Sequence, residues 1–383
     1  MDTLADNNYH DHSGDKPNKW IVVIILIISL AGIIYSFFQK PAGKDVISGK
    51  VLEILSEKDA ILDIGNMNKI VKEQDLLVEI TIKSEKKEIK IFNDYKPVKK
   101  GDKIFLRESL FGDSDWGIVN ISRTKELILL SLFFIILVIL TSGWKGFYSL
   151  IGLLSTFAVI FVFMVPQILK GSSPIGIGII GASLILIPTL YLSYGLNKKS
   201  IATFSGIVIS LFFVGIISNY FVNTLEFTNF AEETFYLNMA SSNAINFIGL
   251  LIAGIIIAAV GVLDDVAAIQ SSIVFSLAKT NPNLHGLKLF REAMRVGKDH
   301  ISAVVNTLVL AYTGSSFPLI LLLTIQNTPL DYLISLEMVA EEIARTLISS
   351  SGLLLAVPLT TVIATMIATR DHPTEVVKNN FSW

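Results

Sequence analysis

The segment INFIGLLIAGIIIAAVGVLDDVAAIQSSIVF, residues 245–275, decides the fold class of this chain. It is almost entirely apolar, and it is longer than the roughly 20 residues that a helix needs to cross the hydrocarbon core of a bilayer. Its only charged side chains are two adjacent carboxylates, Asp264 and Asp265. Such a run predicts a transmembrane helix with acidic groups inside the membrane or at its edge.

Seven further segments have a similar length and composition, so we expect eight transmembrane helices. Besides about 245–275, they are residues 20–38, 127–142, 147–169, 175–194, 201–221, 301–324 and about 343–369. The first is expected to stay in the protein as a signal anchor, because its apolar core is long and no small-residue cleavage site follows it. A hydrophobic content of 52% and a charged content of 17% exclude an ordinary soluble domain.

Charged residues are concentrated between the first two predicted helices. Residues 44–125 contain 16 of the 31 lysines and arginines and 15 of the 33 acidic residues. Within this segment, apolar and polar residues alternate with a period of two, as in Leu77–Ile82 and Lys103–Leu106, and turn-forming pairs separate the alternating runs. The pattern predicts five or six short strands in a small all-β, barrel-like domain of the OB or SH3-like kind.

The predicted organisation has five parts: a tail at 1–19, a signal-anchor helix at 20–38, a β domain at 44–125, a seven-helix membrane domain at 127–369 and a tail at 370–383. Lysines and arginines of the tails and short loops set the orientation of a membrane protein. Placing the N-terminus in the cytoplasm puts most of these basic residues on the cytoplasmic side. Both tails are therefore predicted to be cytoplasmic and the β domain extracytoplasmic.

Several motifs along the chain resemble those of the YibE/F-like family of bacterial multi-pass membrane proteins. They include Ser122–Leu127, Gly143–Phe147, Gly195–Lys199, Arg291–Met294, Gly297–Asp299, Asn306–Ser316 and Glu341–Arg345. The resemblance implies one span, an exported small domain and a seven-helix bundle in the bacterial plasma membrane. It implies no catalytic residue. One departure is the pair Asp264–Asp265 before Val266, where we expect a single aspartate in the family.

The two carboxylates of the sixth predicted span have two interpretations, because charged groups at membrane depth are costly and usually face a cavity or a partner. If the span is centred near Leu263, Asp264 and Asp265 lie at mid-membrane and form a proton-binding group. If it is centred near Ile255, they lie hydrated at the cytoplasmic mouth. The sequence does not distinguish these two positions.

Polar residues on the last two predicted spans also have two interpretations each. Asn306 and Thr313 share one face of a helix by spacing, and they can line a path for water or substrate or can hydrogen-bond to a neighbouring helix. Arg345 can pair with Glu341, four residues before it, and anchor the start of the last helix. Alternatively, Glu342 and Arg345 join Asp264 and Asn306 in one intramembrane polar cluster.

These features favour a permease or transport-like protein, with a proton or ion path formed by Asp264, Asp265, Asn306, Glu342 and Arg345. The alternative is a non-transporting envelope interaction or assembly factor that contacts a protein partner through residues 44–125. We expect no enzyme activity and no cofactor or metal, since no enzyme signature is present. Membrane lipid is the expected partner, and a net charge of −2 argues against nucleic acid. The oligomeric state is not predicted.

Overall fold

The computed structural model describes residues 17–38, 46–64, 67–82, 85–94, 96–108, 116–228, 237, 239, 245–325 and 329–371. Most of the two predicted tails, 1–19 and 370–383, therefore lies outside the described residues. The chain forms two compact units. One comprises residues 35–143, and the other comprises residues 1–34 together with 144–383. We describe each unit by itself.

The smaller unit contains one antiparallel sheet. Its strands are β1 (Val46–Ile64), β2 (Met67–Ile82), β3 (Glu85–Asn93), β4 (Lys103–Glu108) and β5 (Trp116–Ile121). They are arranged in the order β3-β2-β1-β4-β5, with every neighbouring pair antiparallel. The predicted alternation is present, since Leu76, Val78 and Ile80 point to the core while the residues between them are more exposed.

The predicted barrel is not confirmed, because the sheet is open. Among the described strands, no hydrogen-bonded ladder joins β3 to β5, the two ends of the strand order. The sheet is curved nonetheless, and β1 carries irregular pairing between Val51 and Glu53 and between Ile54 and Ser56. Such bulges bend a strand and increase its twist, which lets one open sheet enclose a small core.

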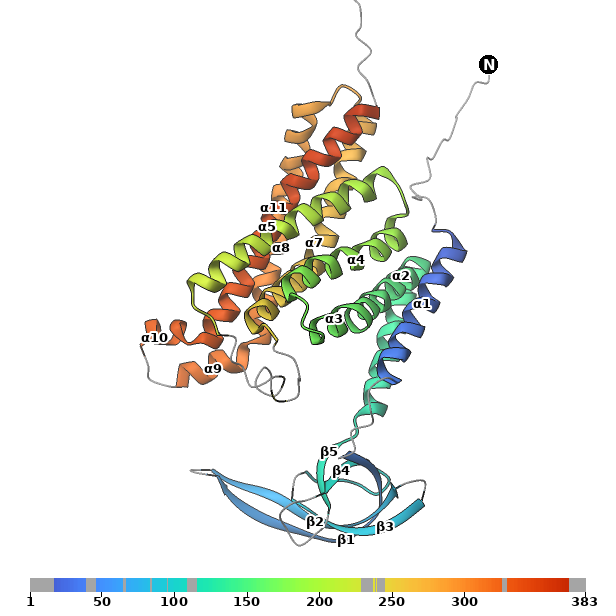
Figure 1. The fold of residues 1–383 in the computed structure, drawn as a ribbon, viewed down its shortest axis with the longest axis vertical. Helices are drawn as coiled ribbons and strands as arrows, with labels where there is room; N and C mark the ends of the chain where they lie inside the picture. Colours follow the sequence, from blue (N-terminus) through green and yellow to red (C-terminus); the bar gives the residue numbers. More distant parts are fainter. Residues whose placement is uncertain are drawn as a thin grey trace, which may run out of the picture. The chain divides into compact units, whose positions relative to one another are not determined.

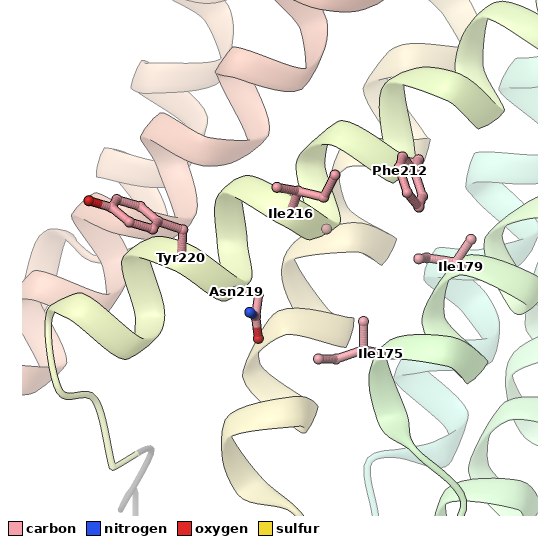
Figure 2. Close-up of a pocket in the computed structure, with 7 residues that line it drawn as sticks. Ile175, Ile179, Phe212, Ile216, Asn219 and Tyr220 are labelled. Carbon is pink, nitrogen blue, oxygen red and sulfur yellow. The ribbon is translucent and has the colours of Figure 1, made fainter.

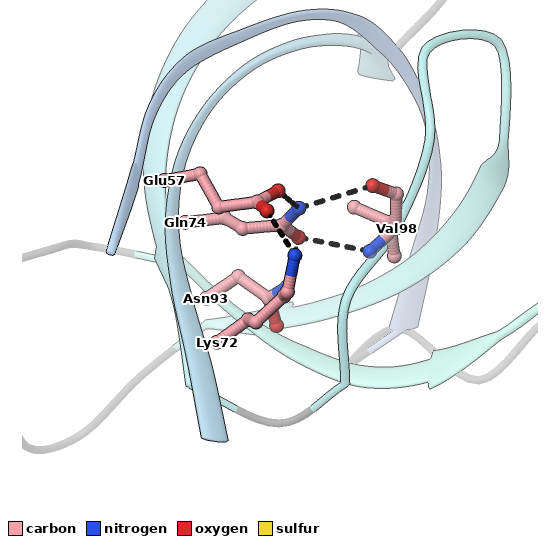
Figure 3. Close-up of polar contacts among 5 residues, drawn as sticks. All are labelled: Glu57, Lys72, Gln74, Asn93 and Val98. Atoms are coloured by element: carbon pink, nitrogen blue, oxygen red, sulfur yellow. Dashed lines mark hydrogen bonds and ion pairs between the residues drawn. The ribbon is translucent and has the colours of Figure 1, made fainter. Parts of the chain in front are cut away.

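A buried glutamine holds the loop after β3 against the sheet (Figure 3). The Gln74 amide nitrogen donates to Glu57 at 2.8 Å and to the Val98 carbonyl at 3.2 Å, and the Gln74 amide oxygen accepts from the Val98 N–H at 2.8 Å and from the Asn93 amide at 3.1 Å. Hydrogen bonds from Lys72, and next from Gln74, hold the pKa of Glu57 below its ordinary value. This carboxylate therefore adds stability above the ordinary glutamate pKa, which is lost as the pH falls through the lowered pKa.

Gln74→Leu should destabilise the β unit by about 2–4 kcal/mol, because the buried polar groups of Val98 and Asn93 lose their partner. Limited proteolysis of the full chain in detergent, followed by mass spectrometry, should show faster cleavage between residues 46 and 121. Glu53→Leu is the matched control, since Glu53 is exposed on the adjacent strand and should give cleavage at the wild-type rate. Equal cleavage of Gln74→Leu and wild type would contradict the structural role of Gln74.

Helices form the rest of the described chain (Figure 1). They are α1 (Lys19–Phe38), α2 (Thr124–Ala158), the π-helix η1 (Val159–Met164), α3 (Val165–Leu169), α4 (Pro174–Tyr194), α5 (Lys198–Thr224), α7 (Phe247–Thr280), α8 (Gly286–Ser315), α9 (Phe317–Ile325), α10 (Leu330–Ser335) and α11 (Glu337–Asp371). Several of these helices are long and strongly apolar, as a membrane protein requires.

Six helical stretches of the described residues are long and apolar enough to cross a membrane. They are Lys19–Ser36, Thr124–Leu169, Pro174–Tyr194, Lys198–Thr224, Phe247–Thr280 and Glu337–Thr369. The predicted count of eight is not confirmed, for two reasons. The expected helices 127–142 and 147–169 form one continuous helical run that is interrupted only by non-helical backbone at Gly143, with φ 55°. The expected helix 301–324 is divided between α8 and α9 at Ser316.

The core of the larger unit lies between α4, α5, α7 and α11. It includes Leu186 from α4, Leu211 from α5, Ile252 and Leu263 from α7, and Ala356 from α11. Helix α1 packs on the second half of α2, where the Ser29 and Ser155 hydroxyls are 3.1 Å apart. α8 covers another side of the bundle, and its first half packs against α7 and α11 through Leu289, Ala293 and Gly297.

Candidate functional site

The two carboxylates lie near the middle of α7, which is one uninterrupted helix of 34 residues. At 1.5 Å per residue, they are about 25 Å from either end of it. Their environments differ, because successive residues of a helix point about 100° apart. Asp264 is half-buried, and its Oδ1 atom is buried without a hydrogen-bond partner among the described residues. Asp265 is exposed on the outer face of α7.

Helix α4 supplies the polar neighbours of Asp264. The Thr189 side chain lies beside the Asp264 carboxyl, and the hydroxyl of Thr189 donates a hydrogen bond to the carbonyl oxygen of Ile185 at 3.1 Å. A hydroxyl has one hydrogen to donate but can also accept. It can therefore donate to an ionised Asp264, or donate to Ile185 while it accepts from a protonated Asp264. The arrangement suits both protonation states of the carboxyl.

The close approach of α4 and α7 explains why Asp264 is covered. A Cβ atom added to Gly178 of α4 would lie 3.3 Å from the Ala253 Cα of α7. The two helices are therefore in near backbone contact at that level. Asp264 lies three turns further along the same face of α7, where Thr189 covers it.

The predicted polar face of α8 points away from the bundle. Asn306 and Thr313 are exposed, whereas Leu308 is buried against Val266 of α7 and Leu353 of α11. The structure therefore brings Asn306 together with none of the other four predicted site residues. The basic segment before it, which includes Arg291 and Arg295, belongs to the same continuous helix.

The structure brings Glu342 and Arg345 together at the start of α11. Their side chains form an ion pair with Arg345 Nη1 and Glu342 Oε2 3.4 Å apart. Arg345 Nε is buried without a hydrogen-bond partner in the described part of the chain. Glu337, one turn before Glu341, instead binds the loop after α5, where it accepts hydrogen bonds from the Thr228 hydroxyl at 2.7 and 2.9 Å.

One buried polar residue was missed by sequence reasoning. Gln270 is 1% exposed, and its amide nitrogen donates to the Thr361 hydroxyl of α11 at 2.8 Å and to the Ala293 carbonyl of α8 at 3.1 Å. It thereby joins three helices at one point. Its signal was present as an amide in an otherwise apolar run, since such side chains commonly hydrogen-bond across membrane helices.

A groove of about 450 Å³ lies between α4 and α5, and Figure 2 shows its lining. Ile175 and Ile179 come from α4, and Phe212, Ile216 and Asn219 come from α5. None of the predicted site residues lines it. Its apolar surface suits hydrocarbon rather than a polar reaction, so the groove and the carboxylates are separate features.

The described residues contain no group of three or more histidine or acidic side chains that could hold a metal ion. Comparisons with curated proteins and with solved structures found no match. The sequence profile of the YibE/F-like protein family matches residues 130–370, which run from the first half of α2 to the last turn of α11. This match covers most of the chain and agrees with the resemblance carried by the motifs. The chain therefore belongs to the YibE/F-like family of proteins.

Proposed function

We propose that this membrane protein is a permease in which Asp264 binds and releases a proton or a cation during transport. The observation that carries the proposal is the buried, unpartnered Oδ1 of Asp264 near the middle of an apolar helix. Intramembrane carboxyl groups are costly, and those that persist generally serve ion or proton pathways. Asp265 is the ionisable group whose charge acts on Asp264, and the charges of both aspartates act on the Tyr194 hydroxyl.

Eight spans remain our interpretation of the chain. The run Thr124–Leu169 has 46 residues, or about 69 Å of helix, more than twice the thickness of a hydrocarbon core. This length supports two spans that meet at Gly143. We place the protein in the bacterial plasma membrane, with both tails cytoplasmic and residues 44–125 outside, on the distribution of lysine and arginine.

Transport can be tested with the full chain in liposomes that enclose a pH-sensitive dye. The liposomes are exposed in turn to inward gradients of inorganic cations, inorganic anions and small organic acids. We expect at least one gradient to drive proton movement that liposomes without protein do not show. Absence of proton movement under every gradient, with correctly inserted protein, would contradict proton coupling.

The second candidate function is a membrane-anchored assembly factor that acts through its β unit. The open sheet favours it, because the ends of a sheet are where partner strands can add. Deleting residues 45–119 separates the two functions. A transporter should retain measurable flux without this segment, whereas an assembly factor should lose all activity in cells.

A further inference from the structure

Several side-chain polar atoms of α5 and α11 are buried without a hydrogen-bond partner in the described residues. Among them are the hydroxyl oxygens of Ser218, near the end of α5, and of Ser349, in the first half of α11, and the Nε atom of Arg345. Ser218 is 0% exposed and Ser349 is 2% exposed. Buried polar groups without partners are rare in folded proteins, and each one needs an explanation.

The packing of two glycines places these atoms at one level. A Cβ on Gly206 of α5 would meet Thr360 of α11, and a Cβ on Gly352 of α11 would meet Val214 of α5. From Gly206 to Val214 the chain advances eight residues along α5, and from Thr360 to Gly352 it goes back eight residues along α11. The two helices are therefore antiparallel. One further turn brings Ser218 level with Ser349.

Arg345 shares the α5-facing side of α11 with Ser349. The two residues are four apart, which places them on one helix face. Arg345 also precedes Gly352 by seven residues, or about two turns, and Gly352 faces α5. Figure 1 shows α5 and α11 side by side. The seam between them therefore holds two buried hydroxyls and the buried Nε atom of Arg345, whose side chain is otherwise 37% exposed.

These groups are chemically suited to an anion. Guanidinium N–H groups and hydroxyls all donate hydrogen bonds, and arginine in particular matches the geometry of carboxylate and phosphate. Glu342 pairs with Arg345 at Nη1, whereas Arg345 Nε has no hydrogen-bond partner among the described residues. The other acidic residues near this end of α11 are Glu337, which is bound to Thr228, and Glu341.

We propose that Arg345, Ser349 and Ser218 form a binding site for a small oxyanion of the carboxylate or phosphate class. If the protein is a permease, as proposed above, the small anion is its transported substrate and Asp264 carries the coupled proton. This transport role rests on the proposed function. Binding itself requires no transport, so the two proposals can fail separately.

The test uses the full chain in detergent at low ionic strength, with acetate and inorganic phosphate as probes and sodium chloride at equal ionic strength as the reference. We expect saturable thermal stabilisation by at least one probe. Ser218→Ala, Ser349→Ala and Arg345→Gln should each weaken binding about ten- to hundredfold, since each removes a donor to a charged ligand. Glu342→Gln should strengthen binding, because it frees Arg345 from a competing carboxylate.

Ser351→Ala is the matched control, because the Ser351 hydroxyl already donates to the Leu347 carbonyl at 2.8 Å. It should bind like the wild type. The site would be overturned if the wild-type protein responded to neither probe. It would also be overturned if Ser218→Ala and Ser349→Ala bound the probes with wild-type affinity, because these two substitutions change no charge and should leave folding intact. If the protein binds anions but moves no protons in liposomes, the proposed transport function is wrong and the proposed anion-binding site still holds.

Discussion

Asp264→Asn should abolish the reaction of the bundle with a hydrophobic carbodiimide and should remove any proton-coupled flux. Carbodiimides modify protonated carboxyl groups in apolar surroundings, and they provide a readout that needs no known substrate. The amide has the shape of the carboxyl and can hydrogen-bond to Thr189, but it cannot bind a proton. Insertion and folding should therefore be retained. Mass spectrometry of the labelled peptide measures the modification.

Asp265→Asn is the matched control, because it changes the neighbouring carboxyl, which is exposed. It should leave both carbodiimide labelling of Asp264 and the flux in place. Labelling that survives in Asp264→Asn but disappears in Asp265→Asn would mean that the exposed carboxyl is the proton carrier. Flux that survives in the double variant would contradict a role for either residue.

Gly206→Ala should destabilise the helix bundle by about 1–3 kcal/mol, the usual cost of overpacking. The added Cβ would lie 2.9 Å from the Thr360 Cα, which belongs to the backbone of α11 and cannot rotate aside. The seam between α5 and α11 must then open. The full chain in detergent should unfold at a lower temperature than the wild type, as followed by loss of monomer in size-exclusion chromatography after heating.

Gly254→Ala provides the comparison on α7. No heavy atom lies within 4 Å of the Cβ it would add, so only helix propensity changes, by up to about 1 kcal/mol in favour of alanine. Its unfolding temperature should equal or exceed that of the wild type. If both variants behave alike, the close contact between Gly206 and Thr360 is absent in the protein.

Much of the fold could be predicted from local composition. The strand alternation at Leu76, Val78 and Ile80 and the long apolar helices are present in the structure, and the family match agrees with the motifs. The closure of the sheet could not be predicted, since it depends on whether β3 and β5 meet, and they are far apart in sequence. The separation of helices at 143–146 coincides with non-helical backbone at Gly143, but the helical run continues beyond it, so the predicted count of eight helices is not confirmed.

The candidate site was less predictable than the fold. By sequence, either of the two adjacent aspartates could be the proton-binding group. Only the contact between α4 and α7 distinguishes the half-buried Asp264 from the exposed Asp265. Helical spacing correctly grouped Asn306 with Thr313, but it did not indicate that their face points outward. Arg345 pairs with Glu342 rather than with Glu341, although both spacings allow an ion pair.

The sequence by itself determined which segments enter an apolar environment and which form a charged β unit. Transfer free energies are properties of individual side chains, so they add up along a segment without reference to the fold. Only the tertiary structure decided which face of each helix is covered. That choice depends on how closely two backbones approach, as at Gly178 and Gly206, and such contacts join residues that are distant along the chain. The same contacts determined which polar atoms are buried without partners, and the proposed function rests on those atoms.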